Sequence, residues 1–436
     1  MSEDSTPVAT IEHLGRFVGQ TVELRGWVHN RTSKGKLHFV TLRDGTGFVQ
    51  CVLKKDKVGD ALFDEIGAAS QESSLVLVGE VRADERAPGG FEIGVAGGRV
   101  LQSTEDFPIT PKEHGADFLL SRRHLWLRSR RQWAILRVRS AILYALRSFF
   151  DERGFVCIDS PIFTPSACEG TSTLFEVGYF DDSAFLTQSG QLYAEASAMA
   201  FGKVYTFGPT FRAEKSKTRR HLTEFWMLEP EMAFAELEDV IQLAEDMLVY
   251  VVKEVLEKRR PELETLERDV SKLEAIQGGF PRITYDDASK ILLEHPESDF
   301  VEGDDFGAPD EEILAREHAQ PLVITNYPKA VKAFYMKEVA DDPTRVLAMD
   351  VIGPDGAGEL IGGSQREENL DVLLEAIRHH DLPESEFEWY LDLRRFGSVP
   401  HGGFGLGLER LVRWITGIEH IRETSPFPRM MTRIRP

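Results

Sequence analysis

Cysteine is scarce in this sequence. Only Cys51, Cys157 and Cys168 occur in 436 residues, and they form no CxxC pair. This argues against a disulfide framework and gives no sign of a structural zinc site. A long apolar run is also missing, and the opening residues MSEDSTPVAT lack the character of a signal peptide. We therefore expect a protein of the reducing cytoplasm.

An excess of positive charge is missing too. The chain has 51 lysines and arginines against 72 aspartates and glutamates, a formal net charge of −21. Nucleic acids bind mainly to lysine and arginine, so this total by itself argues against such a partner. The local distribution of charge is nevertheless compatible with a nucleic-acid partner. Residues 22–57 carry eight basic and three acidic side chains, and residues 118–150 carry eight arginines and no acid.

The pattern of apolar residues predicts two domains. Five short runs alternate like strands within residues 20–101, at 22–28, 38–42, 48–53, 75–81 and 91–95. Five strands in so short a stretch predict a small closed barrel, with the OB-fold as the leading candidate. We expect this barrel domain at 1–104 and a proline-containing linker at 105–127. Helices and strands then mix in 128–436, which indicates an α+β domain.

Two arginine-containing stretches indicate a nucleotide site, although the sequence has no P-loop motif GxxxxGK[ST]. The first is a strand at 204–211 that ends at Arg212, followed by a basic turn and an aromatic strand at 225–228. The second is the glycine-rich segment that begins at Gly402 and leads into a helix whose first turn presents Arg410. The planar fork of arginine fits phosphate oxygens, and displacement at phosphorus depends on charge stabilisation and positioning.

Together the two stretches resemble the second and third signature motifs of the class II aminoacyl-tRNA synthetases. The first motif of that family is a long helix, a strand and a proline. The matching segments here are an amphipathic helix at 131–153, a strand at 155–158 and Pro161. The resemblance implies a homodimer formed through the helix 131–153 and the Pro161 region.

An N-terminal barrel before such a core is similar to the aspartyl, asparaginyl and lysyl group, and most similar to bacterial-type asparaginyl-tRNA synthetases. The resemblance implies an enzyme that attaches asparagine to its tRNA through an asparaginyl-adenylate, with ATP as substrate and Mg²⁺ as cofactor. In relatives the barrel reads the anticodon. The matching residues are Phe39 for stacking and Gln50 for hydrogen bonding, with Glu80 a weaker third. From the residues alone, Phe39 could instead lie in the barrel core and Gln50 could simply face solvent.

The resemblance also assigns roles at the ATP site. It implies that Arg212 binds the α-phosphate, that Phe225 and Arg410 enclose the adenine, and that Arg410 reaches the γ-phosphate. Glu214, His221 and Glu359 would contact ATP as well. Asp350 and Glu359, which flank a turn in a predicted hairpin, would hold Mg²⁺. The catalytic residues would then be Arg212, Arg410 and Glu359.

The expected amino-acid site favours asparagine. The resemblance implies that it contains Ser166, Glu169, Gln191, Glu195, Glu229 and Arg366. Arg366 can hold the amide carbonyl of asparagine, and Glu195 is a candidate acceptor for its NH₂ group. Ala194 stands where aspartyl enzymes carry a lysine that pairs with the substrate carboxylate, and Gly362, Gly363 and Ser364 also depart from the aspartyl pattern.

Two alternatives remain open from the sequence. One is an archaeal-type aspartyl-tRNA synthetase, of the discriminating or the non-discriminating kind. The other is a catalytically inactive paralogue that binds RNA. An insertion around 260–345 is expected in the second domain, and the sequence does not indicate what it does.

Overall fold

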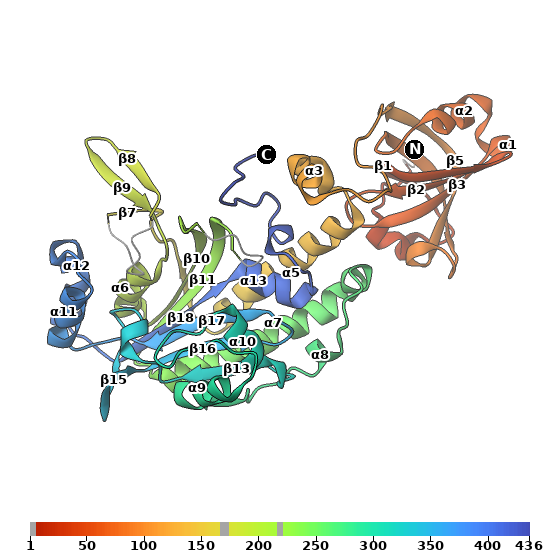
Figure 1. Ribbon diagram of the computed structural model, residues 1–436. Coiled ribbons are helices and arrows are strands. Elements are labelled where there is room, and N and C mark those ends of the chain that lie inside the picture. The colour runs from red at the N-terminus through yellow and green to blue at the C-terminus, as the bar shows by residue number, and fades with distance from the viewer. Residues whose placement is uncertain (1–5, 166–173, 216–220) are drawn as a thin grey trace. The chain divides into compact units, whose positions relative to one another are not determined.

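The computed structural model describes residues 6–165, 174–215 and 221–436 (Figure 1). The chain divides into two compact units, Met1–Leu119 and Leu120–Pro436. The division falls within residues 105–127, and the expected domain bounds 1–104 and 128–436 stay predictions. Among the described residues, no helix is both long and apolar enough to cross a membrane.

The first unit contains the expected closed barrel of five strands. Its order is β1-β2-β3-β5-β4. The strands are β1 (Thr21–Lys34), β2 (Leu37–Arg43), β3 (Phe48–Lys54), β4 (Ser74–Ala83) and β5 (Phe91–Gln102), and the helices α1 (Lys55–Val58) and α2 (Asp60–Ala68) lie between β3 and β4 in the sequence. Side chains alternate along β2, so that Val40 and Leu42 fill the barrel interior. The predicted strand pattern is therefore confirmed.

The second unit is built on an eight-stranded mixed sheet. Its order is β12-β13-β16-β17-β18-β11-β10-β6. The strands are β6 (Val156–Ile158), β10 (Lys203–Phe211), β11 (Glu224–Ala233), β12 (Arg282–Thr284), β13 (Leu322–Thr325), β16 (Ala348–Gly353), β17 (Gly358–Gln365) and β18 (His401–Gly407). The predicted hairpin around Arg212 is β10–β11, and Phe211 pairs with Glu224 beside its tip. Strands that lie far apart in the sequence, β11 and β18, pair side by side.

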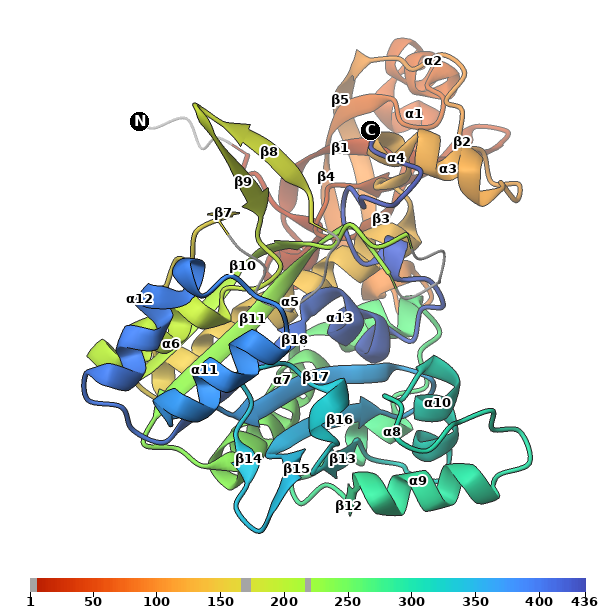
Figure 2. The same cartoon turned by 60° about the vertical axis from the view of Figure 1, so that its left-hand side comes forward.

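Three helices pack on one face of this sheet, α5 (Arg130–Glu152), α7 (Leu237–Thr265) and α13 (Leu408–Thr416). In Figure 2, α5 and α7 run behind the sheet. α5 begins at Ser129, whose side chain accepts a hydrogen bond from the backbone N–H of Gln132. One apolar stripe of α5, which includes Ile142 and Phe149, is fully buried against α7 and the sheet. The stripe predicted from the sequence therefore belongs to the core of the unit.

The remaining elements surround this sheet. A small sheet contains β7 (Phe163–Thr164), β8 (Glu176–Tyr179) and β9 (Asp182–Leu186), and β14 (Glu338–Val339) pairs with β15 (Asp342–Val346). α6 (Gln191–Phe201) contacts α12 (Glu384–Arg395), which packs on α11 (Leu370–His379). The short helices are α3 (Ala116–Ser121), α4 (Arg123–Trp126), α8 (Ser271–Glu274), α9 (Tyr285–Glu294) and α10 (Ala308–Arg316). Within the stretch 260–345, β12 and β13 join the main sheet.

The two faces of the main sheet differ in character because side chains alternate along each strand. On β18, Phe404 and Leu406 point into the core with α5 and α7. Gly403, Gly405 and Gly407 alternate with them and so belong to the opposite face. On the side of the sheet away from the helices, β18 therefore presents backbone without side chains.

Gly403 has no room for a side chain. A Cβ atom there would lie 2.5 Å from the carboxyl carbon of Glu231 and closer still to the carbonyl oxygen of Pro230. At Gly407, on the same strand, nothing lies within 4 Å of the place that a Cβ atom would take, and φ has an ordinary value of −77°. Only one of these two glycines is therefore required by packing.

We expect Gly403→Ala to lower the free energy of unfolding by about 1–3 kcal/mol or more, because the added methyl overfills the space between β18 and β11. Gly407→Ala is the matched control and should change it by less than about 1 kcal/mol. Denaturant unfolding of both variants measures the difference. Equal stability of the two variants would contradict the packing argument.

Candidate active site

Two cavities open on the glycine-rich side of the sheet. The larger has a volume of about 460 Å³, and its walls include Gln191, Glu229 and Arg366. The smaller has a volume of about 310 Å³. Both are bordered by Arg212, Met227, Glu359 and Gly405. The cavities therefore adjoin, with one arginine and one carboxylate at their common border.

The residues expected to bind ATP line the smaller cavity. Its walls include Arg212, Glu214, His221, Phe225 and Arg410. The first four come from the end of β10, the segment after it and the start of β11, whereas Arg410 comes from the first turn of α13. The structure thus brings together two stretches that lie almost 200 residues apart in the sequence.

Glu409 joins the elements that carry these residues. Its carboxylate accepts a hydrogen bond of 3.0 Å from the backbone N–H of Trp226 on β11. It also lies 2.8 Å from a guanidinium nitrogen of Arg139 on α5. The neighbouring Arg410 donates a hydrogen bond of 2.8 Å to the backbone carbonyl of Glu359. Both arginine-bearing segments are therefore fixed to the sheet through buried or partly buried polar contacts.

The two carboxylates expected to hold metal lie on neighbouring strands. A Cβ atom at Gly362 would be 2.8 Å from Oε1 of Glu359 and 3.4 Å from Oδ1 of Asp350, so both border the space above this glycine. Among the described residues, no group of three acidic, histidine or cysteine side chains could hold a metal ion. Two carboxylates nevertheless suit Mg²⁺, which commonly takes one or two protein oxygens together with substrate phosphates.

A lysine from the stretch 260–345 also reaches this point. Nζ of Lys332 lies 2.8 Å from Asp350 and 3.3 Å from Asp305. Burial raises the pKa of Asp350 to about 6; the charge of Lys332 opposes this shift, and that of Glu359 adds to it. Lys332 and Asp305 could not be predicted from the sequence, because no motif marks them.

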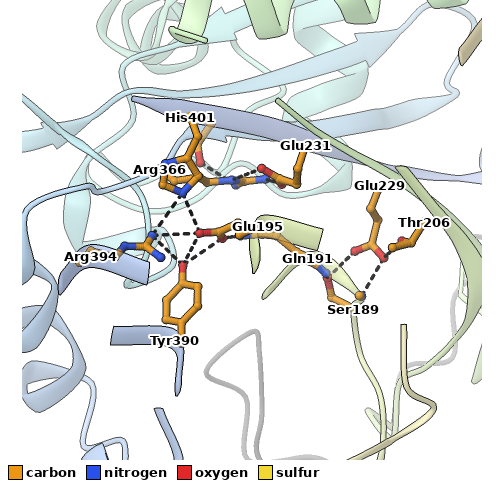
Figure 3. Close-up of polar contacts among 12 residues, drawn as sticks. Ser189, Gln191, Glu195, Thr206, Glu229, Glu231, Arg366, Tyr390, Arg394 and His401 are labelled. Atoms are coloured by element: carbon orange, nitrogen blue, oxygen red, sulfur yellow. Dashed lines mark hydrogen bonds and ion pairs between the residues drawn. The ribbon is translucent and has the colours of Figure 1, made fainter. Parts of the chain in front are cut away.

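Arg366, which lines the larger cavity, forms a buried ion pair with Glu231 (Figure 3). Arg366 donates to the carboxylate of Glu231 through Nη2 and to Oγ of Ser364 through Nη1, the latter at 2.7 Å. Both side chains of the pair are almost completely buried. Burial raises the pKa of Glu231 to about 7, although Arg366 opposes this shift and Glu195 adds to it. A guanidinium beside a carboxylate offers donors and an acceptor to a ligand that has both.

The carboxylate of Glu195 lies in a buried polar cluster. We expected it to accept a hydrogen bond from a substrate amide; neither Glu195 nor Glu231 is among the residues that line the larger cavity. Its oxygens already accept from Tyr390, Arg394, His401 and Gln191. The acceptor role of Glu195 stays a prediction, and Glu231 is a second candidate, since it is the carboxylate paired with Arg366. Alternation along β11 was the signal that could have identified Glu231, because it shares a face with Glu229.

The other residues considered for the amino-acid site differ in where they lie. Glu229 lines it and accepts hydrogen bonds from Oγ of Ser189 and the backbone N–H of Gly190. Ser166 and Glu169 lie outside the described residues. Ala194 is fully buried in an apolar cluster with Ala198 and Val204. The side chain of Ala194 is therefore no part of the cavity wall.

The barrel unit carries a second expected site on its outer surface. Thr41 of β2 pairs with Gln50 of β3, and Phe39 lies two residues from Thr41, so all three share one face. Phe39 is partly exposed, while its neighbours His38 and Val40 are buried. The alternative that places Phe39 in the barrel core is therefore wrong. The side-chain amide of Gln50 donates a hydrogen bond of 3.1 Å to Glu92.

Glu80, the third residue expected on this surface, lies on β4. Its exposed carboxylate pairs with Arg82 at 2.8 Å. Arg82 stands opposite Glu92 on β5, which stands opposite Gln50 on β3. A row of polar side chains therefore crosses three strands of the barrel.

Comparison with known proteins extends over both units. The family model described as tRNA synthetases class II (D, K and N) matches residues 115–431, and the model described as OB-fold nucleic acid binding domain matches residues 22–100. An asparagine–tRNA ligase of Sorangium cellulosum is 56% identical over 442 residues, with 99% of each chain covered. One of Koribacter versatilis is 55% identical over 441 residues, with 99% of this chain and 100% of the relative covered.

A solved structure has the same fold throughout. It is asparaginyl-tRNA synthetase from Pyrococcus horikoshii complexed with asparaginyl-adenylate, with a TM-score of 0.95 and 43% sequence identity. The match covers 99% of this chain and 100% of the solved chain. Since the family model spans most of the chain and relatives match it over their full length, the chain belongs to the class II tRNA synthetases of the D, K and N group.

Proposed function

We propose that this protein is an ATP-dependent asparagine–tRNA ligase. The observation that carries the proposal is the pair of adjoining cavities, one with the side chains for ATP and one lined by Arg366, which forms a buried ion pair with Glu231. Relatives named asparagine–tRNA ligase, at 55–56% identity over nearly the whole chain, support the same function. The aspartyl alternative is not favoured.

The reaction has two steps. The carboxylate of asparagine attacks the α-phosphorus of ATP, which forms asparaginyl-adenylate and releases pyrophosphate. A terminal ribose hydroxyl of tRNA then attacks the mixed anhydride, which forms the ester and releases AMP. Arg212, at the border of both cavities, is in the right place to bind the α-phosphate. Its positive charge would stabilise the negative charge that builds up during in-line displacement.

Glu359 and Asp350 would hold Mg²⁺ at the phosphate end. The metal would supply neutralising charge for the phosphate oxygens when ATP is bound. Glu359 also accepts from Arg410, at 3.4 Å between Oε2 and Nη1, and this contact would orient the guanidinium toward the nucleotide. No covalent enzyme nucleophile is required.

The Arg366–Glu231 pair gives a physical basis for the choice of amino acid. Arg366 would donate to the carbonyl oxygen of the asparagine amide, and Glu231 would accept from its NH₂ group. Aspartate has nearly the same shape, but its carboxylate has no hydrogen to donate and would add negative charge beside Glu231. Leaving buried polar groups unpaired in this way can reduce kcat/KM by about 10⁴–10⁵.

The barrel surface around Phe39 and Gln50 is proposed to bind the anticodon of the asparagine tRNA. A partly exposed aromatic ring offers a stacking platform for a base, and the amide offers hydrogen bonds that distinguish one base from another. Because tRNA and ATP are both present in the cytoplasm, we propose the cytoplasm as the place of action.

We also propose a homodimer through α5 and the Pro161 region. β6 is the last strand in the order of the main sheet. Tyr144 on α5 is 66% exposed, and the exposed apolar residues Val156 and Ile162 flank the same region. Contact with a second copy would remove this apolar surface from water.

The test of function is pyrophosphate exchange with asparagine and with aspartate in parallel. We expect exchange with asparagine and at least about a hundredfold lower kcat/KM with aspartate, because of the unpaired groups described above. Equal or faster exchange with aspartate would overturn the asparagine assignment. Absence of exchange with both would favour the catalytically inactive alternative.

Arg212→Ala and Arg410→Ala should each reduce the rate of adenylate formation by about 10²–10³, by analogy with the loss of one transition-state donor. Arg316→Ala is the control, because this partly exposed arginine pairs with Glu297 and lies in neither cavity. Thermal unfolding should confirm that all three variants fold. Wild-type rates of pyrophosphate exchange in both active-site variants would refute the proposed ATP site.

Phe39→Ala should weaken tRNA binding by about 1–3 kcal/mol, since one base loses its stacking partner. Pyrophosphate exchange, which needs no tRNA, should remain at the wild-type rate. Val18→Ala removes another exposed apolar side chain of the same unit and serves as the control. Direct measurement of tRNA affinity distinguishes the outcomes. A parallel loss of exchange would point to a general structural defect instead.

A further inference from the structure

Glu195 is the centre of a buried polar cluster beside the larger cavity. The cluster consists of Glu195 on α6, Tyr390 and Arg394 on α12 and His401 on β18 (Figure 3). The side chains of Glu195, Arg394 and His401 are completely buried. The proposed mechanism gives this Glu195 cluster no direct role. Charged side chains buried in this way must be stabilised by ion pairs and hydrogen bonds.

The contacts around Glu195 come from donors on three sides. The hydroxyl of Tyr390 lies 2.8 Å from Oε2, Nη2 of Arg394 lies 2.9 Å from it, and Nε2 of His401 lies 2.9 Å from it. Burial by itself would raise the pKa of Glu195, but Arg394, His401 and Arg366 hold it below its usual value. Glu195 is therefore an ionised carboxylate, which can only accept hydrogen bonds.

This fixes the side-chain amide of Gln191. Gln191 and Glu195 are four residues apart on α6, so they lie on the same side of the helix. Nε2 of Gln191 lies 3.1 Å from Oε1 of Glu195. The opposite orientation of the amide would place its oxygen against a carboxylate and is excluded by repulsion. The NH₂ group of Gln191 therefore faces Glu195, and its Oε1 remains available to the cavity that Gln191 lines.

Arg394 also connects the cluster to the other side of the cavity. Its Nε donates a hydrogen bond of 2.8 Å to the backbone carbonyl of Glu367. Glu367 directly follows Arg366, the proposed partner of the substrate amide. One arginine of α12 thus holds both the carboxylate that orients Gln191 and the backbone beside Arg366.

We propose that Glu195 is a positioning residue, which orients Gln191 so that its carbonyl oxygen accepts a hydrogen bond from the α-ammonium group of the amino-acid substrate. The inference rests on the proposed function. Arg366 and Glu231 account for the amide end of asparagine, so the ammonium group is the remaining donor. The α-carboxylate of the substrate cannot occupy this place, because it would face the oxygen of Gln191.

The test compares asparagine with succinamate, which is asparagine without the α-amino group. Dissociation constants are measured calorimetrically in the absence of ATP for the wild type and for Glu195→Gln. The wild type should prefer asparagine by about tenfold or more, the effect of one hydrogen bond to a charged group. Glu195→Gln should reduce this preference to about threefold or less, because a neutral amide at 195 permits Gln191 to rotate.

The ratio of the two constants separates positioning from general damage. Loss of packing alone would weaken both ligands by the same factor and leave the preference intact, which would overturn the proposal. Glu388→Gln is the matched control, since Glu388 is an exposed carboxylate of α12 that pairs with Arg395 at 2.7 Å. This control should keep the wild-type preference.

Two further measurements cover the remaining outcomes. If Glu195→Gln does not fold, Gln191→Ala provides the test, because it keeps the cluster and removes only the proposed acceptor. It should also lose the preference for asparagine over succinamate, and full retention would overturn the proposal. Failure of the proposed function is distinguishable, because the wild type would then show neither asparagine binding nor asparagine-dependent pyrophosphate exchange.

Discussion

The alternation of side chains along the central strands is the constraint on which the rest of the catalytic unit depends. On β11, Leu228 and Met232 face the helices, and Glu229 and Glu231 necessarily face the other way. A shift of register by one residue would exchange these sets and place carboxylates in the apolar core. The register of β11 that buries its apolar side chains therefore also determines that Glu229 and Glu231 lie on the opposite face of the sheet.

β18 uses the alternation differently. Its inward positions carry large apolar residues such as Phe404, whereas its outward positions are glycines. The absence of side chains at Gly403 and Gly405 leaves space for Glu231 and for the cavities above the sheet. A glycine-rich strand is thus compatible with a stable core because only one of its faces needs side chains.

The sequence predicted the framework of the molecule well. The barrel strands, the amphipathic helix before Pro161, the β10–β11 hairpin and the segment that carries Arg410 all follow from local periodicity and short motifs. The six residues expected around ATP border one cavity. Local patterns suffice here because each motif lies within one hairpin or one strand–helix connection.

The sequence did not indicate contacts between distant segments. Arg394 and His401, some 200 residues further along the chain, surround the carboxylate of Glu195. Lys332 comes to the phosphate end from a stretch without a recognisable motif. Neither contact could be inferred from spacing, since each depends on how helices and strands pack in three dimensions.

The common border of the two cavities has a consequence for the fate of the intermediate. Asparaginyl-adenylate is a single molecule with an amino-acid end and a nucleotide end, so it would occupy both cavities at once. When one end detaches, the other keeps it at a high effective concentration beside its site, and rebinding competes with escape. Adjoining cavities therefore favour retention of a water-sensitive anhydride until tRNA arrives, while pyrophosphate, held at one end only, can leave.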